Sequence, residues 1–148
     1  MSLMNTIAQQ LTNRHETIAV AESCTGGGLA HCISQVPGIS NVFLGGMVTY
    51  ANSAKINLLN IPKDTIATHG AVSKEVALLM AKNCQQAFGS TWALSTTGIA
   101  GPSGGSKEKP VGLVWIGIAG PTIHEAYQFI FEENLSRVEH QRKTIEQA

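Results

Sequence analysis

The sequence lacks an excess of charge of either sign. Its ten Lys and Arg residues balance ten Asp and Glu residues, so the formal net charge is zero at pH 7. A neutral protein has no long-range field that would attract nucleic acid or an anionic membrane surface. We therefore expect neither nucleic acid nor a membrane as a partner, and any anionic ligand must be held by local contacts.

Long apolar runs and paired cysteines are also missing. No run approaches the roughly 18 residues needed to cross a bilayer, and the N-terminus lacks the charged-then-apolar pattern of a secretion signal. The three cysteines, Cys24, Cys32 and Cys84, form no CxxC pair, and an odd number suits a reducing compartment. We expect a cytoplasmic protein. We expect no metal either, because His31 and Cys32 are the one adjacent pair of good ligands and would point about 100° apart on a helix.

The standard phosphate-binding fingerprints are absent as well. Gly-x-x-x-x-Gly-Lys-Ser/Thr does not occur, which argues against a P-loop NTPase. Gly98, Gly101 and Gly104 are spaced three apart and do not form Gly-x-Gly-x-x-Gly, which argues against a dinucleotide-binding Rossmann site.

The patterns that are present predict one α/β domain over residues 1–148. Residues 1–3, ahead of Met4, are expected to be residues added to the natural chain and are set aside in the fold prediction. Apolar runs predict five strands and helical spacing predicts five helices. The strands are expected at residues 17–21, 42–50, 91–96, 111–119 and 123–131, and the helices at 5–14, 29–33, 52–59, 74–88 and after Ser136. The order predicts a three-layer α/β/α domain with a mixed, mostly parallel sheet of about five strands, one of them reversed.

Two glycine-rich loops each follow a predicted buried strand. The first covers residues 22–28 and the second residues 97–105. Glycine permits positive φ and lets a ligand approach bare N–H groups, and the first loop leads into a helix whose N-terminal dipole favours anions. The pair predicts an anion-binding site at the ends of the strands.

Two nucleophiles can be derived from the residues alone. Cys24, in a strand-to-helix turn, could have a depressed pKa, although a small buried side chain is the favoured interpretation because no histidine is placed to pair with it. Ser40 could attack if a neutral Lys55 took its proton, with Tyr50 relaying it. A strand of roughly 20 Å separates Ser40 from Lys55, so they need not meet. Spacing alone favours a turn serine, a strand tyrosine and a solvated lysine.

Five motifs in order indicate a family. They are residues 22–27 (ESCTGG), 48–55 (VTYANSAK), 69–73 (HGAVS), 97–102 (TGIAGP) and 109–112 (KPVG). Together they resemble the CinA C-terminal domain family, which includes stand-alone nicotinamide-nucleotide amidohydrolases. The resemblance implies hydrolysis of the carboxamide of nicotinamide mononucleotide (NMN) to nicotinate mononucleotide and ammonia, in pyridine nucleotide recycling. It also implies a homo-oligomer that needs no cofactor.

The resemblance also implies roles for single residues. It makes Ser40 the nucleophile, Lys55 the general base and Tyr50 the assisting hydroxyl. Arg137 is expected near the substrate phosphate, for which its planar fork of donors is suited. The remaining expected substrate-binding residues lie in the two glycine loops: Ser23, Thr25, Gly26, Gly27, Thr97, Gly98 and Gly101.

The chain departs from the family pattern at three places. Gly45 stands where many members have arginine, Ile39 where many have serine, and Leu135-Ser136 where many have Gly-Asp. These departures leave an alternative open, a catalytically silent nucleotide-binding or regulatory module. A hydrolase dependent on Cys24 is a third hypothesis.

Overall fold

The computed structural model describes residues 2–148 and contains a five-stranded sheet in the order β2-β1-β3-β4-β5. Strand β1 pairs in parallel with both β2 and β3, whereas β4 runs antiparallel to β3 and to β5. Four strands therefore share one direction and β4 is reversed. The strands are β1 (Ile18–Glu22), β2 (Phe43–Val48), β3 (Trp92–Gly98), β4 (Leu113–Ala119) and β5 (His124–Ile130).

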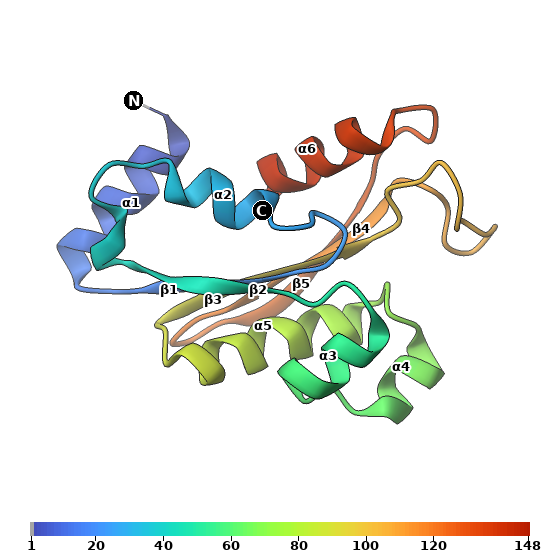
Figure 1. Cartoon of the computed structure of the whole chain (residues 1–148), viewed down its shortest axis with the longest axis horizontal. Helices are drawn as coiled ribbons and strands as arrows, with labels where there is room; N and C mark the ends of the chain where they lie inside the picture. Colours follow the sequence, from blue (N-terminus) through green and yellow to red (C-terminus); the bar gives the residue numbers. More distant parts are fainter. Residues whose placement is uncertain (1) are drawn as a thin grey trace.

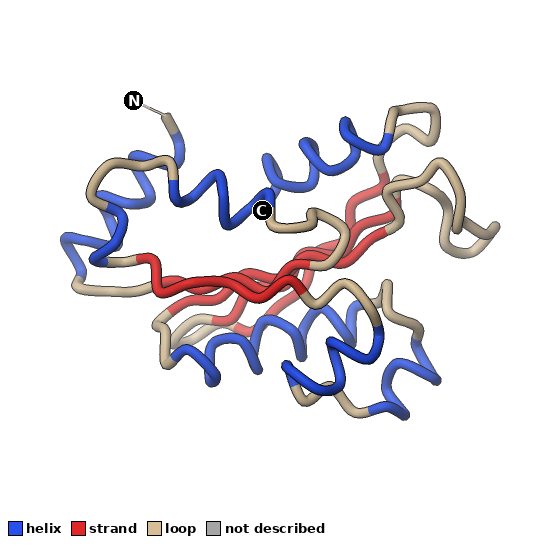
Figure 2. The backbone as a smooth tube through the Cα atoms, viewed as in Figure 1, coloured by secondary structure: helices blue, strands red, loops and turns tan. Residues whose placement is uncertain are grey.

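Helices cover both faces of the sheet (Figure 1). One face carries α1 (Leu3–Arg14), α2 (Gly28–Ser34) and α6 (Arg137–Gln147). The other carries α5 (Lys74–Phe88), against which α3 (Asn52–Leu59) and α4 (Lys63–His69) pack. The backbone trace in Figure 2 shows the sheet as the middle layer between these two groups. The predicted three-layer α/β/α architecture is confirmed.

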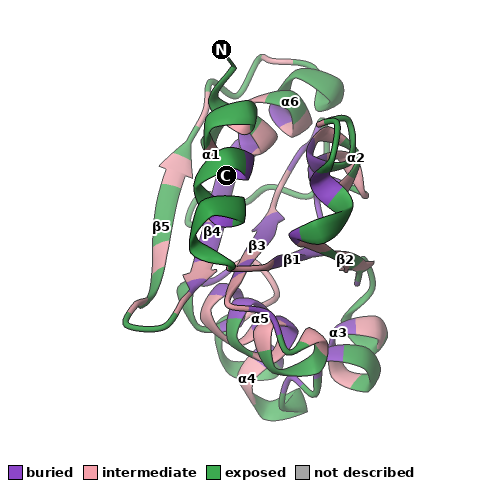
Figure 3. Ribbon diagram, turned by 90° about the vertical axis from the view of Figure 1, so that its left-hand side faces the viewer, coloured by how far each residue is buried: buried purple, intermediate pink, exposed green. Residues whose placement is uncertain are grey.

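The core lies on both sides of β1, and all five residues of this strand are buried. One apolar cluster joins the sheet to α5 through Val76, Met80 and Cys84, and a second joins it to α1 and α2 through Leu11 and Leu29. In Figure 3 the central strands are mainly buried, whereas β5 is largely exposed. Gly117 of β4 permits close packing of α5, because a Cβ there would lie 2.4 Å from the Ala77 carbonyl oxygen.

Local signals account for the helix ends. Ser73 and Ser136 cap α5 and α6 as predicted, and at α6 Glu139 completes a capping box. Helix α4 was not predicted, since Pro62 precedes it and its seven residues bury only Ile66. Ser2 caps α1 and Leu3 is its first residue, so two of the three residues that were set aside in the fold prediction take part in this helix. Met1 lies outside the described residues.

The topology gathers the carboxyl ends of β1, β2 and β3 at one edge of the sheet, because these strands are parallel neighbours. This edge is where open α/β sheets bind ligands. The strand ends lead into Ser23, Thr49 and the second glycine loop. Over residues 2–148, no helix has the length and apolar character needed to span a membrane.

Candidate active site

Lys55 is the most unusual side chain at this edge, because its ammonium is buried and only 1 % of the residue is exposed. It projects from α3, and Nζ donates to the carbonyl oxygens of Thr49 (2.9 Å) and Tyr50 (3.0 Å) and to Ser23 Oγ (2.9 Å). Burial lowers the pKa of Lys55 below its ordinary value of 10.5, and the nearby Cys24 thiol opposes this shift. A lysine with a lowered pKa can act as a base.

Ser23 is the hydroxyl that the structure brings to this lysine. It follows directly on β1, and its backbone N–H donates to the Thr96 carbonyl of β3 at 3.0 Å. Ser23 and Lys55 lie 32 residues apart in the sequence. They meet because β1 and β2 are parallel and adjacent, so that the residues following each strand emerge together. The sequence signal that could have identified Ser23 as a nucleophile is its place in the turn between a buried strand and a helix.

Glu22, which sequence reasoning gave no role, fixes the turn that carries Ser23. Its buried carboxylate accepts from the backbone N–H groups of Leu29 (2.8 Å) and Ala30 (2.9 Å) and from the Thr25 hydroxyl (2.6 Å). A buried charge is tolerated only with such partners. The Thr25 hydroxyl also bonds to that of Thr96 at 2.7 Å, which ties the turn to β3.

Ser40 does not reach Lys55, so the structure does not bring the expected nucleophile to the expected base. Ser40 is exposed in the short 3₁₀ helix Ile39–Asn41, which precedes β2. Lys55 follows the other end of β2, and six strand residues span roughly 20 Å. Ser40 and Lys55 are close in the sequence, but strand β2 separates the two residues in space.

Cys24 is buried next to Ser23, and its environment disfavours the thiolate. Burial raises the pKa of Cys24 to about 12, and the opposing effects of its own backbone N–H and of Lys55 are smaller. A thiolate is the nucleophilic form of cysteine, so this environment suits an inert buried thiol. The structure thus weighs against a hydrolase dependent on Cys24.

The first glycine loop presents fewer open donors than its sequence suggested. The N–H of Gly26 donates to the Ser23 carbonyl and that of Gly28 to the Thr25 carbonyl, while the next two amides of α2 are taken by Glu22. Thr25 is likewise engaged with Glu22. Gly26 and Gly27, both at positive φ, shape the turn. Among the residues that the structure describes, Thr25, Gly26 and Gly27 do not line the cavity that Ser23 and Lys55 face.

The second glycine loop does line a cavity with Ser23 and Lys55. This cavity has a volume of about 260 Å³, and Thr97, Gly98 and Gly101 form part of its wall. The Thr97 hydroxyl donates to the Ala71 carbonyl at 2.9 Å, which joins β3 to the segment before α5. The loop therefore forms one wall of the space that the serine and lysine face.

Arg137 and Tyr50 lie on the rim of the same cavity, and both are exposed. Arg137 Nη1 donates to the Gly101 carbonyl oxygen at 2.7 Å, and Nη2 donates to the Tyr50 hydroxyl. The hydroxyl of Tyr50 thus contacts Arg137, whereas the backbone carbonyl oxygen of Tyr50 accepts a hydrogen bond from Lys55. A guanidinium carries five N–H donors, so donors remain for a ligand.

The three departures from the family pattern are not among the described residues that line this cavity. Gly45 is in the middle of β2, and a Cβ there would approach the Phe88 ring of α5 to 2.9 Å. Ile39 is buried against α1 and α2. Ser136 accepts from the Glu139 N–H at the start of α6, the capping role that aspartate also performs.

Residues 2–148 contain no group of three His, Cys, Asp or Glu side chains placed to hold a metal ion. A larger cavity, about 510 Å³, lies between α1, α2 and the end of α6. Its wall is mainly apolar, with Leu29, Ile33 and Ile145, and it holds no paired nucleophile and base. The Ser23 and Lys55 cavity is therefore the better candidate for chemistry.

The fold and the site define a three-layer α/β/α protein with a buried serine and lysine pair at the carboxyl edge of its parallel strands. The CinA C-terminal domain family matches residues 1–148, and the chain belongs to this family. A CinA-like protein of Prochlorococcus marinus (strain MIT 9515) is 47% identical over 145 residues, which cover 97% of this chain and 34% of that protein. One from Synechococcus sp. is 54% identical over 121 residues, covering 82% of this chain and 29% of its own length.

Solved structures agree with this assignment. The competence damage-inducible protein A (ComA) from Klebsiella pneumoniae has a TM-score of 0.92 at 29% identity, covering 98% of this chain and 89% of its own. The competence/damage inducible protein CihA from Agrobacterium tumefaciens has a TM-score of 0.86 at 34% identity, covering 99% and 96%. The chain spans about a third of the length of the curated relatives it matches.

Proposed function

We propose that the protein is an amidohydrolase that converts NMN to nicotinate mononucleotide and ammonia, with Ser23 as nucleophile and Lys55 as general base. The observation that carries this proposal is the 2.9 Å contact between Lys55 Nζ and Ser23 Oγ beside an open cavity. A hydroxyl is a weak nucleophile until a neighbouring base takes its proton. Lys55 is placed for that role, and burial lowers its pKa.

The proposed reaction has two halves. Neutral Lys55 takes the proton of Ser23 while Oγ forms a bond to the carboxamide carbon, which gives a tetrahedral oxyanion. The carbon–nitrogen bond then breaks, the amine takes a proton from Lys55, and ammonia leaves an acyl-enzyme. Water attacks the ester, Lys55 accepts a proton from it and returns one to Ser23, and nicotinate mononucleotide is released.

Backbone amides beside Ser23 are suited to stabilise the oxyanion. Within the described chain, the N–H groups of Cys24 and Thr25 bond to no carbonyl or carboxylate oxygen. Donors that directly follow a nucleophile are well placed, and loss of one typically costs about 2.7–4 kcal/mol of barrier. This assigns the oxyanion donors to the first glycine loop.

Arg137 and the second glycine loop are proposed to hold the phosphate of NMN. Arg137 is exposed on the cavity rim with unused donors, and its contact with Gly101 attaches it to the loop. A guanidinium can bond a phosphate through two parallel N–H groups. The carboxamide would then enter beside Ser23 with the phosphate at the rim.

The test is ammonia release from NMN by wild type, Ser23→Ala and Ser40→Ala. We expect Ser23→Ala to lose turnover by at least about 10⁴-fold, since it lacks the nucleophile. Ser40→Ala, a surface change far from the cavity, should stay within about twofold. Hydroxylamine added during turnover should capture the acyl group as a hydroxamate. Full activity in Ser23→Ala would contradict the mechanism.

The silent nucleotide-binding module gives a different result in the same experiment. Calorimetry would show NMN binding while wild type released no ammonia. The sequence departures that motivated this alternative do not line the cavity over residues 2–148, so they give no structural reason for lost activity. Binding without turnover would nevertheless overturn the amidohydrolase proposal.

We also propose that the protein forms a homo-oligomer, as the family resemblance implies. Strand β2 is an edge strand, and Leu44 and Val48 on it are 42% and 49% exposed. An unpaired edge with apolar side chains favours association. Light scattering with size-exclusion chromatography tests this, and a monomeric mass at micromolar concentration would contradict it.

A further inference from the structure

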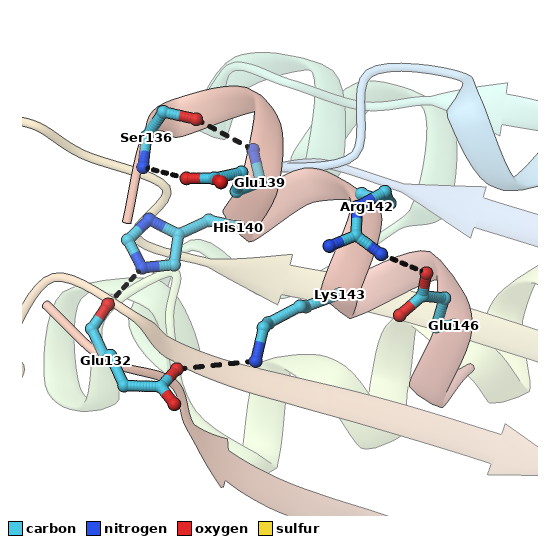
Figure 4. A network of polar contacts seen from close by, with 7 residues as sticks. All are labelled: Glu132, Ser136, Glu139, His140, Arg142, Lys143 and Glu146. Carbon is cyan, nitrogen blue, oxygen red and sulfur yellow. Dashed lines mark hydrogen bonds and ion pairs between the residues drawn. The ribbon is translucent and has the colours of Figure 1, made fainter. Parts of the chain in front are cut away.

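His140 of α6 is buried, with 1 % of the residue exposed, and each of its ring nitrogens contacts a backbone carbonyl. Nδ1 lies 2.7 Å from the Ala100 oxygen and Nε2 lies 2.8 Å from the Glu132 oxygen. Figure 4 shows the ring above the Glu132 carbonyl, with the α6 capping box beside it. Neither contact involves the serine or the lysine, but Ala100 belongs to the second glycine loop, which lines the cavity.

The two contacts place a condition on the protons of this ring. A backbone carbonyl oxygen only accepts hydrogen bonds, and a neutral imidazole donates from one nitrogen only. Both distances are those of good hydrogen bonds. Both bonds can therefore form together only when the ring carries two N–H groups, which is the imidazolium form.

The two carbonyls belong to different segments. Ala100 lies in the second glycine loop, next to Gly101, whose own carbonyl accepts from Arg137. Glu132 lies in the connection between β5 and α6. We propose that His140, as an imidazolium, is a positioning residue that ties the cavity loop of residues 97–105 and the 131–135 connection to α6.

The charged groups on α6, which carries His140, and on the connection before it are of both signs. On α6 these are Arg137, Glu139, Arg142, Lys143 and Glu146, and on the β5–α6 connection they are Glu132 and Glu133. The pKa of Glu139 is lowered mainly by the Ser136 N–H, and that of Glu132 mainly by its own N–H and then by Lys143. Both carboxylates are therefore anionic at neutral pH, and the doubly protonated ring is inferred from its two carbonyl partners alone.

The other elements packed against the ring contribute no anion. Residues 97–105 of the glycine loop contain no ionisable side chain. Farther along the loop, Lys109 Nζ donates to the His69 carbonyl at 2.5 Å, on the α4 side. From the β1–α2 turn, the neighbouring group is Cys24, whose carbonyl accepts from Gln141 at 3.0 Å. On α6, the β5–α6 connection and residues 97–105, the anions are thus the Glu132, Glu133, Glu139 and Glu146 carboxylates.

Imidazole nitrogen NMR of the wild-type protein tests the protonation directly and needs no substrate. Near neutral pH, we expect both nitrogens of His140 to carry protons and to show couplings to the carbonyl carbons of Ala100 and Glu132. His124, whose exposed ring has a single carbonyl partner, Leu78, serves as the reference. A ring with one unprotonated nitrogen under these conditions would overturn the proposal.

Two variants separate the two arms. Asn places an amide donor near the position of Nδ1, and Gln places one near that of Nε2. In hydrogen exchange, His140→Asn should keep residues 97–105 protected and expose residues 131–135, whereas His140→Gln should do the reverse. We expect about tenfold faster exchange in the released segment, the effect of one lost hydrogen bond. Equal exchange in both segments for both variants would contradict the assignment, and His124→Gln is the matched control.

The effect on catalysis rests on the proposed function and forms a separate readout. His140→Gln should raise KM for NMN about fivefold to tenfold with kcat within about twofold, and His140→Asn should restore KM. In wild type, KM should rise over the pH range in which NMR shows the ring losing a proton. Over the same range the protection of a tied segment, measured relative to its intrinsic exchange rate at each pH, should fall. If NMN is not a substrate, the NMR and exchange results still decide the proposal. Protection of both segments that stayed constant through that proton loss would refute it.

Discussion

Replacement of Lys55 by methionine tests the serine and lysine pair most directly. Methionine fills a similar volume and has no titratable group. Wild-type Lys55 donates to three oxygens at 2.9–3.0 Å while 1 % exposed. Lys55→Met should lower kcat for ammonia release by about 10²–10⁴-fold, the usual contribution of a general base.

The stability of this variant follows from two opposing effects. Two backbone carbonyls lose their donor, which costs about 1 kcal/mol each. Against this, burial lowers the folded-state pKa of Lys55 below 10.5, so the wild-type protein must either bury a charge or release a proton. Removing the lysine relieves that cost, and we expect Lys55→Met to remain folded, with a free energy of unfolding within about 3 kcal/mol of wild type.

The pH dependence has a definite sign. Between the folded and unfolded pKa values of Lys55, the unfolded chain holds the proton that the native state lacks, so native stability rises with pH. Wild type should therefore gain stability relative to Lys55→Met as the pH is raised toward 10.5. The wild-type kcat/KM should rise over the same range and level off above the folded pKa, because the neutral amine is the base.

Urea unfolding and ammonia assays across this range provide the measurements. The reasoning would be refuted if Lys55→Met kept turnover within about tenfold of wild type, since a base could not then be essential. A stability difference that did not vary with pH would show that burial of Lys55 leaves its proton affinity unchanged. Global unfolding of the variant would indicate a structural lysine.

Further substitutions address the rest of the site. Arg137→Met should raise KM for NMN by about tenfold or more with kcat little changed, because the guanidinium binds the phosphate without reacting. Arg142→Met on the same helix is the control. A loss confined to kcat would contradict the role of Arg137 in binding the phosphate. Cys24→Ala should keep turnover within about threefold, and iodoacetamide should not inactivate wild type at neutral pH, since the thiol pKa is raised to about 12; rapid inactivation traced to Cys24 would argue otherwise. Glu22→Gln should lower the free energy of unfolding, measured in urea, by about 1.5–3 kcal/mol because charged hydrogen bonds to α2 are lost. The control Glu146→Gln, at an exposed position, should change it by less than about 1 kcal/mol. Equal effects of the two substitutions would show that the Glu22 contacts are weak.

Much of the fold could be predicted from local patterns. The helix Asn52–Leu59 has the predicted bounds, and the serine caps place the starts of α5 and α6. These features depend on residues a few positions apart, which a single sequence displays directly. Helix α4 could not be found in this way, because it buries a single residue and its stability comes from packing on α5.

The site could be predicted only in part. Lys55 was identified through the family motif, but its partner depends on which strands lie side by side. The order β2-β1-β3 brings Ser23 to Lys55, and nothing within residues 40–55 reveals that neighbour. The roles of Glu22 and His140 were missed for the same reason, since their partners are mainly backbone groups of other segments, which carry no sequence signal.

Helix α6 forms hydrogen bonds to backbone carbonyls in both loops of the site. Arg137, His140 and Gln141 donate to the carbonyl oxygens of Gly101, Ala100 and Cys24. Every residue type supplies such an oxygen, so these bonds do not depend on which side chains the loops carry. Loop side chains that face a ligand can therefore be exchanged, by evolution or by design, while the same helix keeps the loops in position. Altering substrate preference need not then require rebuilding the support of the site.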